Sequence, residues 1–210
     1  MPRLSRAEKR EETRRALLNS AARCFARSGF EAAAIDVIAE DAGYSRGAFY
    51  SNFQSKDEVF LLLLKAHLKA ELGSLEDMLA KVQSSDDLIS RVAHRYRNLG
   101  RDEDWCLLFS EFQLYVMRDG SKASAFKALF DEYRLRLSAM IGECCERIGL
   151  TLEITPYELA VSLLSIAHGL SLQRVSNPAI RHTLAAEAIA IFAAGAFANA
   201  PRSKTPLSPN

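Results

Sequence analysis

The sequence predicts an all-α fold of about nine helices, in which a three-helix N-terminal domain containing a helix-turn-helix precedes a larger helical domain. Three observations lead to this prediction. Apolar residues recur at spacings of three and four, helix-capping residues stand at intervals along the chain, and the alternation typical of strands is absent. With 49% hydrophobic residues among 210, the chain can bury a substantial core.

Three helices are predicted in the first part of the chain. The first runs from Glu8 to Ser28 and ends at Gly29, because glycine is favoured just after a helix. The next two are short and cover residues 35–41 and 46–52.

Six longer helices are predicted in the remainder. Ser55 and Glu58 form a capping box, so the fourth helix starts there. Thr155-Pro156 and Asn177-Pro178 each combine a capping side chain with a proline, which is favoured at the first position of a helix. The predicted ranges are 55–79, 85–100, 103–118, 121–147, 156–174 and 179–198. We therefore expect a helix-turn-helix domain at 1–54, a helical domain at 55–200 and a disordered tail at 201–210, where prolines are frequent and apolar residues are few.

The segment 35–52 has the features of a helix-turn-helix. Gly43 can adopt the positive φ that a tight turn needs, and Ser45 can cap the second short helix. Phe49 and Phe53, four residues apart, anchor that helix to the core. Its outer face is then left with Arg46, Gly47, Tyr50 and Asn52.

The charge is unevenly distributed, although its net value is +1. Residues 1–56 carry ten Lys and Arg against seven Asp and Glu, a balance of +3, whereas residues 57–210 have a balance of −2. A basic end favours contact with a polyanion. A solvated helix face explains the same charges equally well.

Residues 8–60 are similar to the signature of the tetracycline-repressor (TetR) family of transcription regulators. The similarity is carried by Gly29-Phe30, residues 35–39, residues 42–53 and Ser55-Lys56. The family usually has Ser or Thr before the second helix, where this chain has Ala33-Ala34, so a capping oxygen is missing there.

The resemblance implies a function. We expect a ligand-responsive, cytoplasmic DNA-binding regulator, by family default a repressor, that binds a palindromic operator in double-stranded DNA as a homodimer. A small, largely apolar effector would release it, and residues 55–200 would bind that effector and dimerise.

The resemblance also implies particular DNA contacts. Arg46 and Gly47 are expected at base edges, where an arginine fork matches guanine O6 and N7. Tyr50 and Lys56 are expected at phosphates. The full set of expected DNA-binding residues is Arg14, Tyr44, Ser45, Arg46, Gly47, Tyr50, Asn52 and Lys56. Structural roles stay open for three of them: packing for Tyr44, ending the helix for Asn52 and simple solvation for Arg14.

Two features of the later helices suggest a dimer and a pocket. The last two helices are rich in small and apolar residues, which suits either a dimer interface or an internal helix pair. The middle helices carry an aromatic cluster, which suits either a solid core or an apolar ligand pocket with a few polar groups. The candidate ligand-binding residues are His67, Trp105, Phe109, Phe112, Gln113, Phe130, Tyr133 and His168.

Other functions find little support in the sequence. No catalytic constellation, cofactor motif or metal-ligand spacing is apparent, so we expect no enzyme, no catalytic residue, no cofactor and no metal. The apolar run at 59–64 is too short to span a membrane, and no signal peptide is expected at the charged N-terminus. A thiol-based redox sensor on the same scaffold is the alternative, although the acidic neighbours of Cys144 and Cys145 oppose thiol reactivity. A helical interaction module that does not bind DNA is a further alternative.

Overall fold

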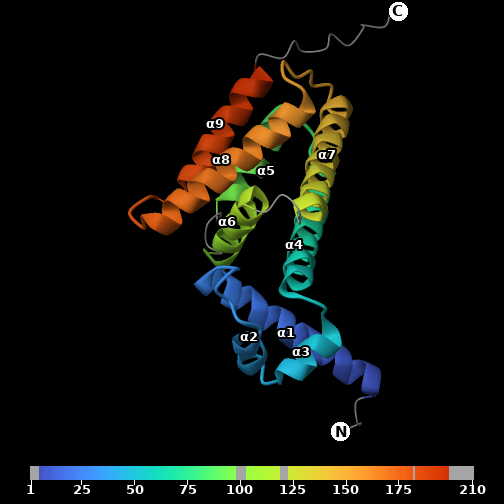
Figure 1. Ribbon diagram of the computed structural model, residues 1–210. Coiled ribbons are helices and arrows are strands. Elements are labelled where there is room, and N and C mark those ends of the chain that lie inside the picture. The colour runs from blue at the N-terminus through green and yellow to red at the C-terminus, as the bar shows by residue number, and fades with distance from the viewer. Residues whose placement is uncertain (1–4, 98–102, 119–122, 182, 199–210) are drawn as a thin grey trace, which may run out of the picture. The chain divides into compact units, whose positions relative to one another are not determined.

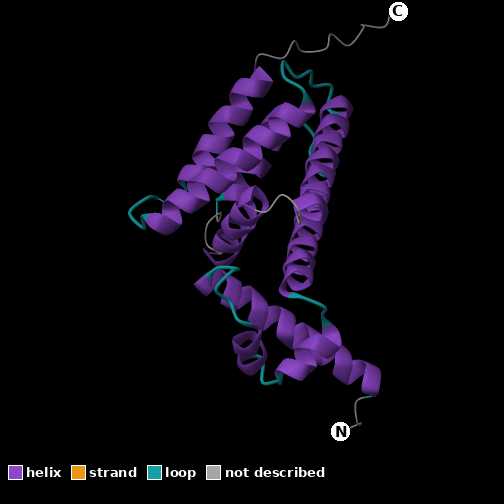
Figure 2. Ribbon diagram, viewed as in Figure 1, coloured by secondary structure: helices purple, strands orange, loops and turns teal. Residues whose placement is uncertain are grey.

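The computed structural model describes residues 5–97, 103–118, 123–181 and 183–198, and the secondary structure within these ranges is entirely α-helical (Figure 1, Figure 2). The predicted all-α class is thus confirmed. The helices of the described ranges are α1 (Arg6–Ser28), α2 (Ile35–Asp41), α3 (Arg46–Asn52), α4 (Lys56–Leu79), α5 (Ser85–Tyr96), α6 (Glu103–Arg118), α7 (Ala123–Arg147), α8 (Pro156–Ser176) and α9 (Leu184–Ala198). None of the helices in the described part of the chain has both the length and the apolar character needed to cross a membrane.

The chain divides into two compact units. The first unit comprises Met1–Lys69 and Glu103–Leu129, and the second comprises Ala70–Asp102 and Phe130–Asn210. Two of the three divisions fall within helices, α4 and α7, and none of the three coincides with the boundary after residue 54 that the sequence suggested. The predicted tail at 201–210 lies outside the described residues.

The start of α1 differs from the prediction. Ser5 is the N-cap: its hydroxyl accepts from the backbone N–H of Glu8 at 3.2 Å, and the Glu8 carboxylate accepts from the Ser5 N–H at 2.7 Å. This capping box satisfies two N–H groups that a helix leaves free, so α1 begins at Arg6 rather than Glu8.

The start of α9 also differs, because the Asn177-Pro178 pair forms a turn instead of a helix start. The Asn177 side chain accepts from the Ala179 N–H at 3.1 Å, and the Asn177 carbonyl accepts from the Ile180 N–H at 3.0 Å. Asparagine and proline are both favoured in such turns. The helix therefore begins at Leu184, not at residue 179.

The core of the first unit is aromatic. The Phe30 and Phe60 rings stack with centroids 4.7 Å apart, and Phe25 meets the Phe60 ring edge-on at 5.3 Å. Phe112 of α6 and Phe126 of α7 complete the cluster, with centroids 5.0 Å apart. Each of these rings is buried, and each is large, so the cluster contributes strongly to the stability of this unit.

The core of the second unit is formed by α4, α5, α7, α8 and α9. Helices α8 and α9 pack along one another, and α9 also packs on α5 (Figure 1). Leu159 of α8 and Ile189 of α9 are completely buried.

Candidate nucleic-acid interface and ligand cavity

The turn between α2 and α3 has the predicted geometry. Gly43 has φ +79°, and the Tyr44 N–H donates to the Ala39 carbonyl at 2.8 Å. The Ser45 hydroxyl accepts from the Ala48 N–H at 3.2 Å and caps α3. Ala34 stands at the N-cap of α2 without a side-chain hydrogen bond, as its residue type requires.

Two buried phenylalanine rings anchor one side of helix α3, and an arginine of α1 binds its C-terminal end. Phe49 and Phe53 are buried, as their spacing predicted. The Arg14 guanidinium of α1 donates to the Asn52 carbonyl at 2.7 Å and lies 4.4 Å from the centre of the Phe53 ring. Arg14 thus satisfies a free carbonyl at the C-terminus of α3. Arg14 is therefore not simply solvated, and its contact with DNA stays a prediction. No local pattern pointed to its contact with Asn52, because the two residues are 38 positions apart.

The exposed side of α3 carries the residues expected to meet base edges. Arg46, Gly47 and Tyr50 are all exposed. Arg46 forms an ion pair with Asp36 of α2 at 2.9 Å, and its guanidinium carbon lies 5.6 Å from the centre of the Tyr50 ring. The Tyr50 side chain and the Asp36 carboxylate both raise the pKa of Arg46, which therefore stays cationic. Asp36 is not among the DNA-binding residues expected from the sequence.

Lys56, expected at a phosphate, is engaged with the loop between α1 and α2. Its ammonium donates to the carbonyls of Phe30 at 2.8 Å and Glu31 at 3.0 Å, and it lies 4.8 Å from the centre of the Phe30 ring. An ammonium has three donors, so a third remains for a phosphate.

Two other expected contacts are partly buried. Tyr44 is half-buried in the turn. The Asn52 amide nitrogen donates to the Ala48 carbonyl at 2.8 Å, and α3 ends at Asn52. Its amide oxygen is buried without a hydrogen-bond partner in the described residues. This geometry favours the helix-ending role for Asn52.

A polar cluster fixes α2 against α1. The buried Ser20 hydroxyl lies 2.8 Å from the Ile38 carbonyl and 2.7 Å from the Asp41 carboxylate, which also accepts from Arg23 at 2.6 Å. These hydrogen bonds, first from Ser20 and then from Arg23, lower the pKa of Asp41. The cluster holds α2, against which α3 packs.

The candidate ligand-binding residues are divided between the two units, and their joint site stays a prediction. Trp105 stacks on His67 with centroids 3.3 Å apart, and Phe112 belongs to the aromatic core of the first unit. Gln113 is exposed, which is unsuited to lining an interior pocket. Phe109 and His168 are half-buried, Phe130 and Tyr133 are buried, and burial raises the pKa of Tyr133 and lowers that of His168.

An apolar cavity of about 40 Å³ lies within the second unit. None of the eight candidates lines it, although Tyr96, whose pKa is raised by burial, does. By this measure a water molecule needs about 10–15 Å³, so the cavity holds only a small group unless side chains move. Its walls are Leu75, Met78, Leu79, Leu88, Val92, Tyr96, Leu137, Ile141, Cys144, Leu159, Leu163, Ala193 and Phe197.

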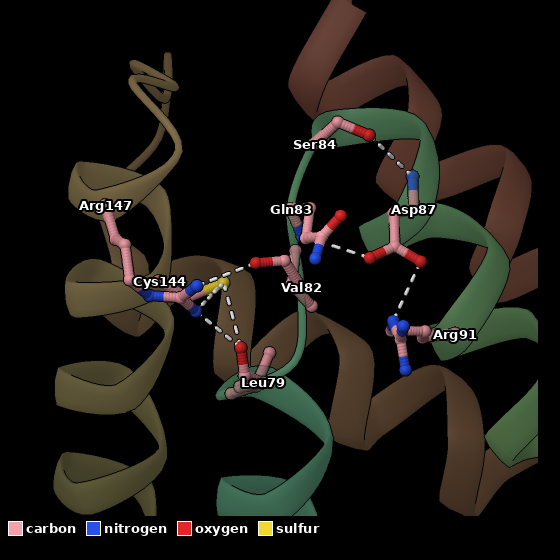
Figure 3. A network of polar contacts seen from close by, with 8 residues as sticks. All are labelled: Leu79, Val82, Gln83, Ser84, Asp87, Arg91, Cys144 and Arg147. Carbon is pink, nitrogen blue, oxygen red and sulfur yellow. Dashed lines mark hydrogen bonds and ion pairs between the residues drawn. The ribbon is translucent and has the colours of Figure 1, made fainter.

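The cysteines are buried, as expected for core residues. Figure 3 shows Cys144 beside the last residue of α4: its thiol lies 3.9 Å from the Leu79 carbonyl, and Arg147 donates to the carbonyls of Leu79 and Val82. Burial raises the pKa of the Cys144 thiol and raises that of Cys145 to about 11. Burial is thus the main cause, rather than the acidic neighbours that the sequence suggested, and thiols of this kind react slowly.

A family model described as "Bacterial regulatory proteins, tetR family" matches residues 17–63, the segment that holds the helix-turn-helix. Over this segment the chain is similar to the TetR family. The description of that family names regulatory proteins, which agrees with the regulator expected from the sequence.

Two curated relatives, both helix-turn-helix transcriptional repressors, illustrate the similarity. The transcriptional repressor AcnR of Corynebacterium diphtheriae is 38% identical over 88 residues, which are 38% of this chain and 46% of that protein. The chain thus matches only about half the length of such relatives. The nicotine-responsive repressor HdnoR of Paenarthrobacter nicotinovorans is 25% identical over 181 residues, 84% of this chain and 88% of that protein.

Solved structures agree on the fold. A transcriptional regulator from Saccharomonospora viridis in complex with choline has a TM-score of 0.72 and 18% identity, and the match covers 91% of this chain and 100% of that one. At this identity the likeness concerns the fold alone.

Proposed function

We propose that this chain is a transcription regulator of the TetR family that binds a palindromic operator as a homodimer through α3. The exposed side of α3 supports this proposal most strongly. Arg46, Gly47 and Tyr50 are exposed there, while Phe49 and Phe53 hold the helix from the other side. A helix presented in this way fits the major groove.

Each exposed side chain has a distinct role in the proposed complex. Arg46 is the base reader, since a guanidinium donates two parallel hydrogen bonds to guanine. Gly47 adds no side chain and allows close approach. Tyr50 and the remaining donor of Lys56 contact phosphates, which position the protein without selecting a sequence.

The proposed dimer forms through α8 and α9. Ile191 of α9 is 74% exposed, an unusual position for a large apolar side chain in a helix built mostly of alanine and other apolar residues. Tyr157 and Leu172 of α8 are exposed as well. A twofold dimer matches a palindrome, because each recognition helix then meets an equivalent half-site.

The proposed regulation is repression relieved by a small, largely apolar molecule. HdnoR is named as nicotine-responsive, and the Saccharomonospora viridis regulator holds choline. The cavity of the second unit is the site we propose here, since Leu75, Met78 and Leu79 in its wall end the helix that begins at Lys56. A ligand that moves these turns shifts α4, and can do so only by binding the DNA-free state more tightly. Because both vicinal thiols are buried, we favour this mechanism over redox sensing.

The test begins with DNA fragments selected by the full-length protein from genomic DNA of the source organism. Arg46→Ala should lower affinity for the selected site by about 1–3 kcal/mol per half-site and relax preference at one base pair. Lys56→Ala should weaken binding to all duplexes and reduce the salt slope by about one.

Two outcomes contradict the proposal. If the wild-type protein selects no sequence over random duplex, it is not an operator-binding regulator. If Arg46→Ala lowers affinity equally for selected and random DNA, Arg46 is not the reader.

A further inference from the structure

The pair formed by Asp36 and Arg46 joins the two helices of the helix-turn-helix on its exposed side. Arg46 is the first residue of α3 and Asp36 the second of α2, and their side chains meet at 2.9 Å. Tyr50, one turn along α3, lies against the same guanidinium. The Asp36 carboxylate thus holds the residue proposed to read bases.

Fold stability does not account for this ion pair. The two side chains are 61% and 60% exposed, and ion pairs this exposed contribute little to stability. A carboxylate next to the recognition helix also repels phosphates, so by itself it opposes binding to any duplex. An acid in this position therefore calls for an explanation at the DNA interface.

We propose that Asp36 is a specificity-determining residue: it positions the Arg46 guanidinium for guanine and raises the cost of binding every other sequence. This proposal rests on the DNA-binding function proposed above. Asp36 acts through Arg46, so it is a positioning residue for base recognition.

The positioning effect follows from the donors of the guanidinium. Arginine has five N–H groups in a fixed plane, and Asp36 accepts from the Nη1 end of Arg46. The remaining N–H groups stay available for guanine O6 and N7. One guanidinium can therefore satisfy the carboxylate and the base together, in an orientation that the carboxylate fixes beforehand.

The discriminating effect arises when the base opposite Arg46 is not guanine. If Arg46 turns away to a phosphate, the Asp36 carboxylate is left at the interface without its cation, near the negative charge of the DNA. A charged group without a partner at a desolvated interface costs affinity. Asp36 thus penalises complexes in which Arg46 serves only as a phosphate contact.

The test compares Asp36→Asn with the wild-type full-length chain on two duplexes: the consensus that the wild type selects from a library of randomised duplexes, and a random duplex of equal length. Asp36→Asn should reduce the ratio of the two affinities by about tenfold, mainly through tighter binding to random DNA. The salt slope for random DNA should steepen by about one, as Arg46 becomes a phosphate contact.

Glu40→Gln is the matched control, since it removes the same charge from the same exposed helix outside the Asp36–Arg46 pair. It should leave the affinity ratio nearly unchanged. In an Arg46→Ala background, Asp36→Asn should also lose its effect on the ratio. Unchanged melting temperatures for both acid variants would show that folding is not the cause.

Three results would overturn the proposal. If Asp36→Asn keeps the affinity ratio of the wild type, Asp36 does not determine specificity, while the proposed function still stands. If Asp36→Asn and Glu40→Gln change the affinity ratio equally, the effect comes from the loss of any negative charge on α2 and not from the pair with Arg46. A wild-type chain that selects no consensus refutes the proposed function and this inference together.

Discussion

Single side chains of the first unit hold α2 and α3 in place through contacts between residues far apart in the sequence. Arg14 reaches from α1 to the end of α3, and Ser20 reaches from α1 to α2. Each side chain bonds to a backbone carbonyl of another helix. The orientation of the helix-turn-helix on α1 therefore depends on a few polar groups as well as on the aromatic core.

Arg14→Ala should lower the free energy of unfolding by about 1–2 kcal/mol, because it removes a charge-assisted hydrogen bond and the contact with the Phe53 ring. Arg15→Ala is the control, since Arg15 is the exposed neighbour on the same helix, and it should change stability by less than about 0.5 kcal/mol. Urea unfolding of the two variants measures both effects. Equal losses would show that Arg14 is an ordinary surface arginine.

Asp41 should make the stability of the protein dependent on pH in acid. Its pKa is lowered in the folded state by Ser20 and Arg23, so the charged carboxylate stabilises the fold at any pH above the unfolded value of about 3.9. That contribution is lost as the pH falls through the lower, folded pKa. The difference in unfolding free energy between wild type and Asp41→Asn should thus be constant near neutral pH and shrink below about pH 4.

Thermal or urea unfolding at a series of pH values measures this difference. Ser20→Ala should weaken the same pH dependence, because it removes the first of the two donors to the carboxylate. A wild-type and Asp41→Asn difference that grows toward acid pH would contradict the assignment.

At the scale of helices, local signals in the sequence predict much of the structure. The capping side chains of α3 and α8 and the anchoring phenylalanines of α3 act within one turn of the chain, so their roles were predictable. Asn177-Pro178 was ambiguous, because the same residues favour both helix starts and turns. The helix and its turn could be distinguished only by the packing of the chain around them.

In the candidate interface, features within one helix were predictable, but pairs between helices were not. The exposure of Arg46 and Tyr50 follows from the burial of Phe49 and Phe53 on the same helix. The Asp36–Arg46 and Arg14–Asn52 pairs could not be found, because they join different helices and leave no periodic pattern. For the same reason the aromatic stripe of α6 could not reveal the partners of Phe112 in the aromatic core, or the lining of the apolar cavity in the second unit.

Gly29, which ends α1, should tolerate alanine less well than Gly43. Both have positive φ, of +78° and +79°, which costs an alanine about 1–3 kcal/mol. A Cβ at Gly29 would also lie 3.1 Å from the Glu111 carboxylate, which accepts from the Phe30 N–H, whereas nothing lies within 4 Å of a Cβ at Gly43. Thermal unfolding should show the larger loss for Gly29→Ala, and equal losses would mean that Glu111 moves aside freely.

At the scale of the whole molecule, the basic N-terminal segment suits a different partner from the C-terminal helices, which are rich in small and apolar residues. The first suits a polyanion and the second suits another copy of the chain. A dimer is needed for the proposed operator, because one α3 alone covers one half-site.

Ile191→Glu should convert the proposed dimer to monomers, because it places a charge at an exposed apolar position of α9. Binding to a palindrome should then weaken far more than binding to a single half-site. Met117→Glu is the control, since Met117 is 73% exposed on α6. Sedimentation equilibrium measures the outcome, and a soluble Ile191→Glu variant that remains dimeric would place the interface elsewhere.

The cavity of the second unit should decide whether the regulator responds to an apolar effector. Ala193 is 1% exposed and lies in the cavity wall, so Ala193→Leu should fill part of the space while leaving the DNA-binding helices unchanged. A panel of apolar compounds with one hydrogen-bonding group should raise the melting temperature of the wild type but not that of the variant, and should release DNA only from the wild type. Tenfold release requires about 1.4 kcal/mol of preference for the DNA-free state.

Ala139→Leu, on the exposed side of α7, is the control, because it adds the same side chain outside the cavity and should respond as the wild type does. If Ala193→Leu responds fully to a compound that acts on the wild type, the effector binds at another site.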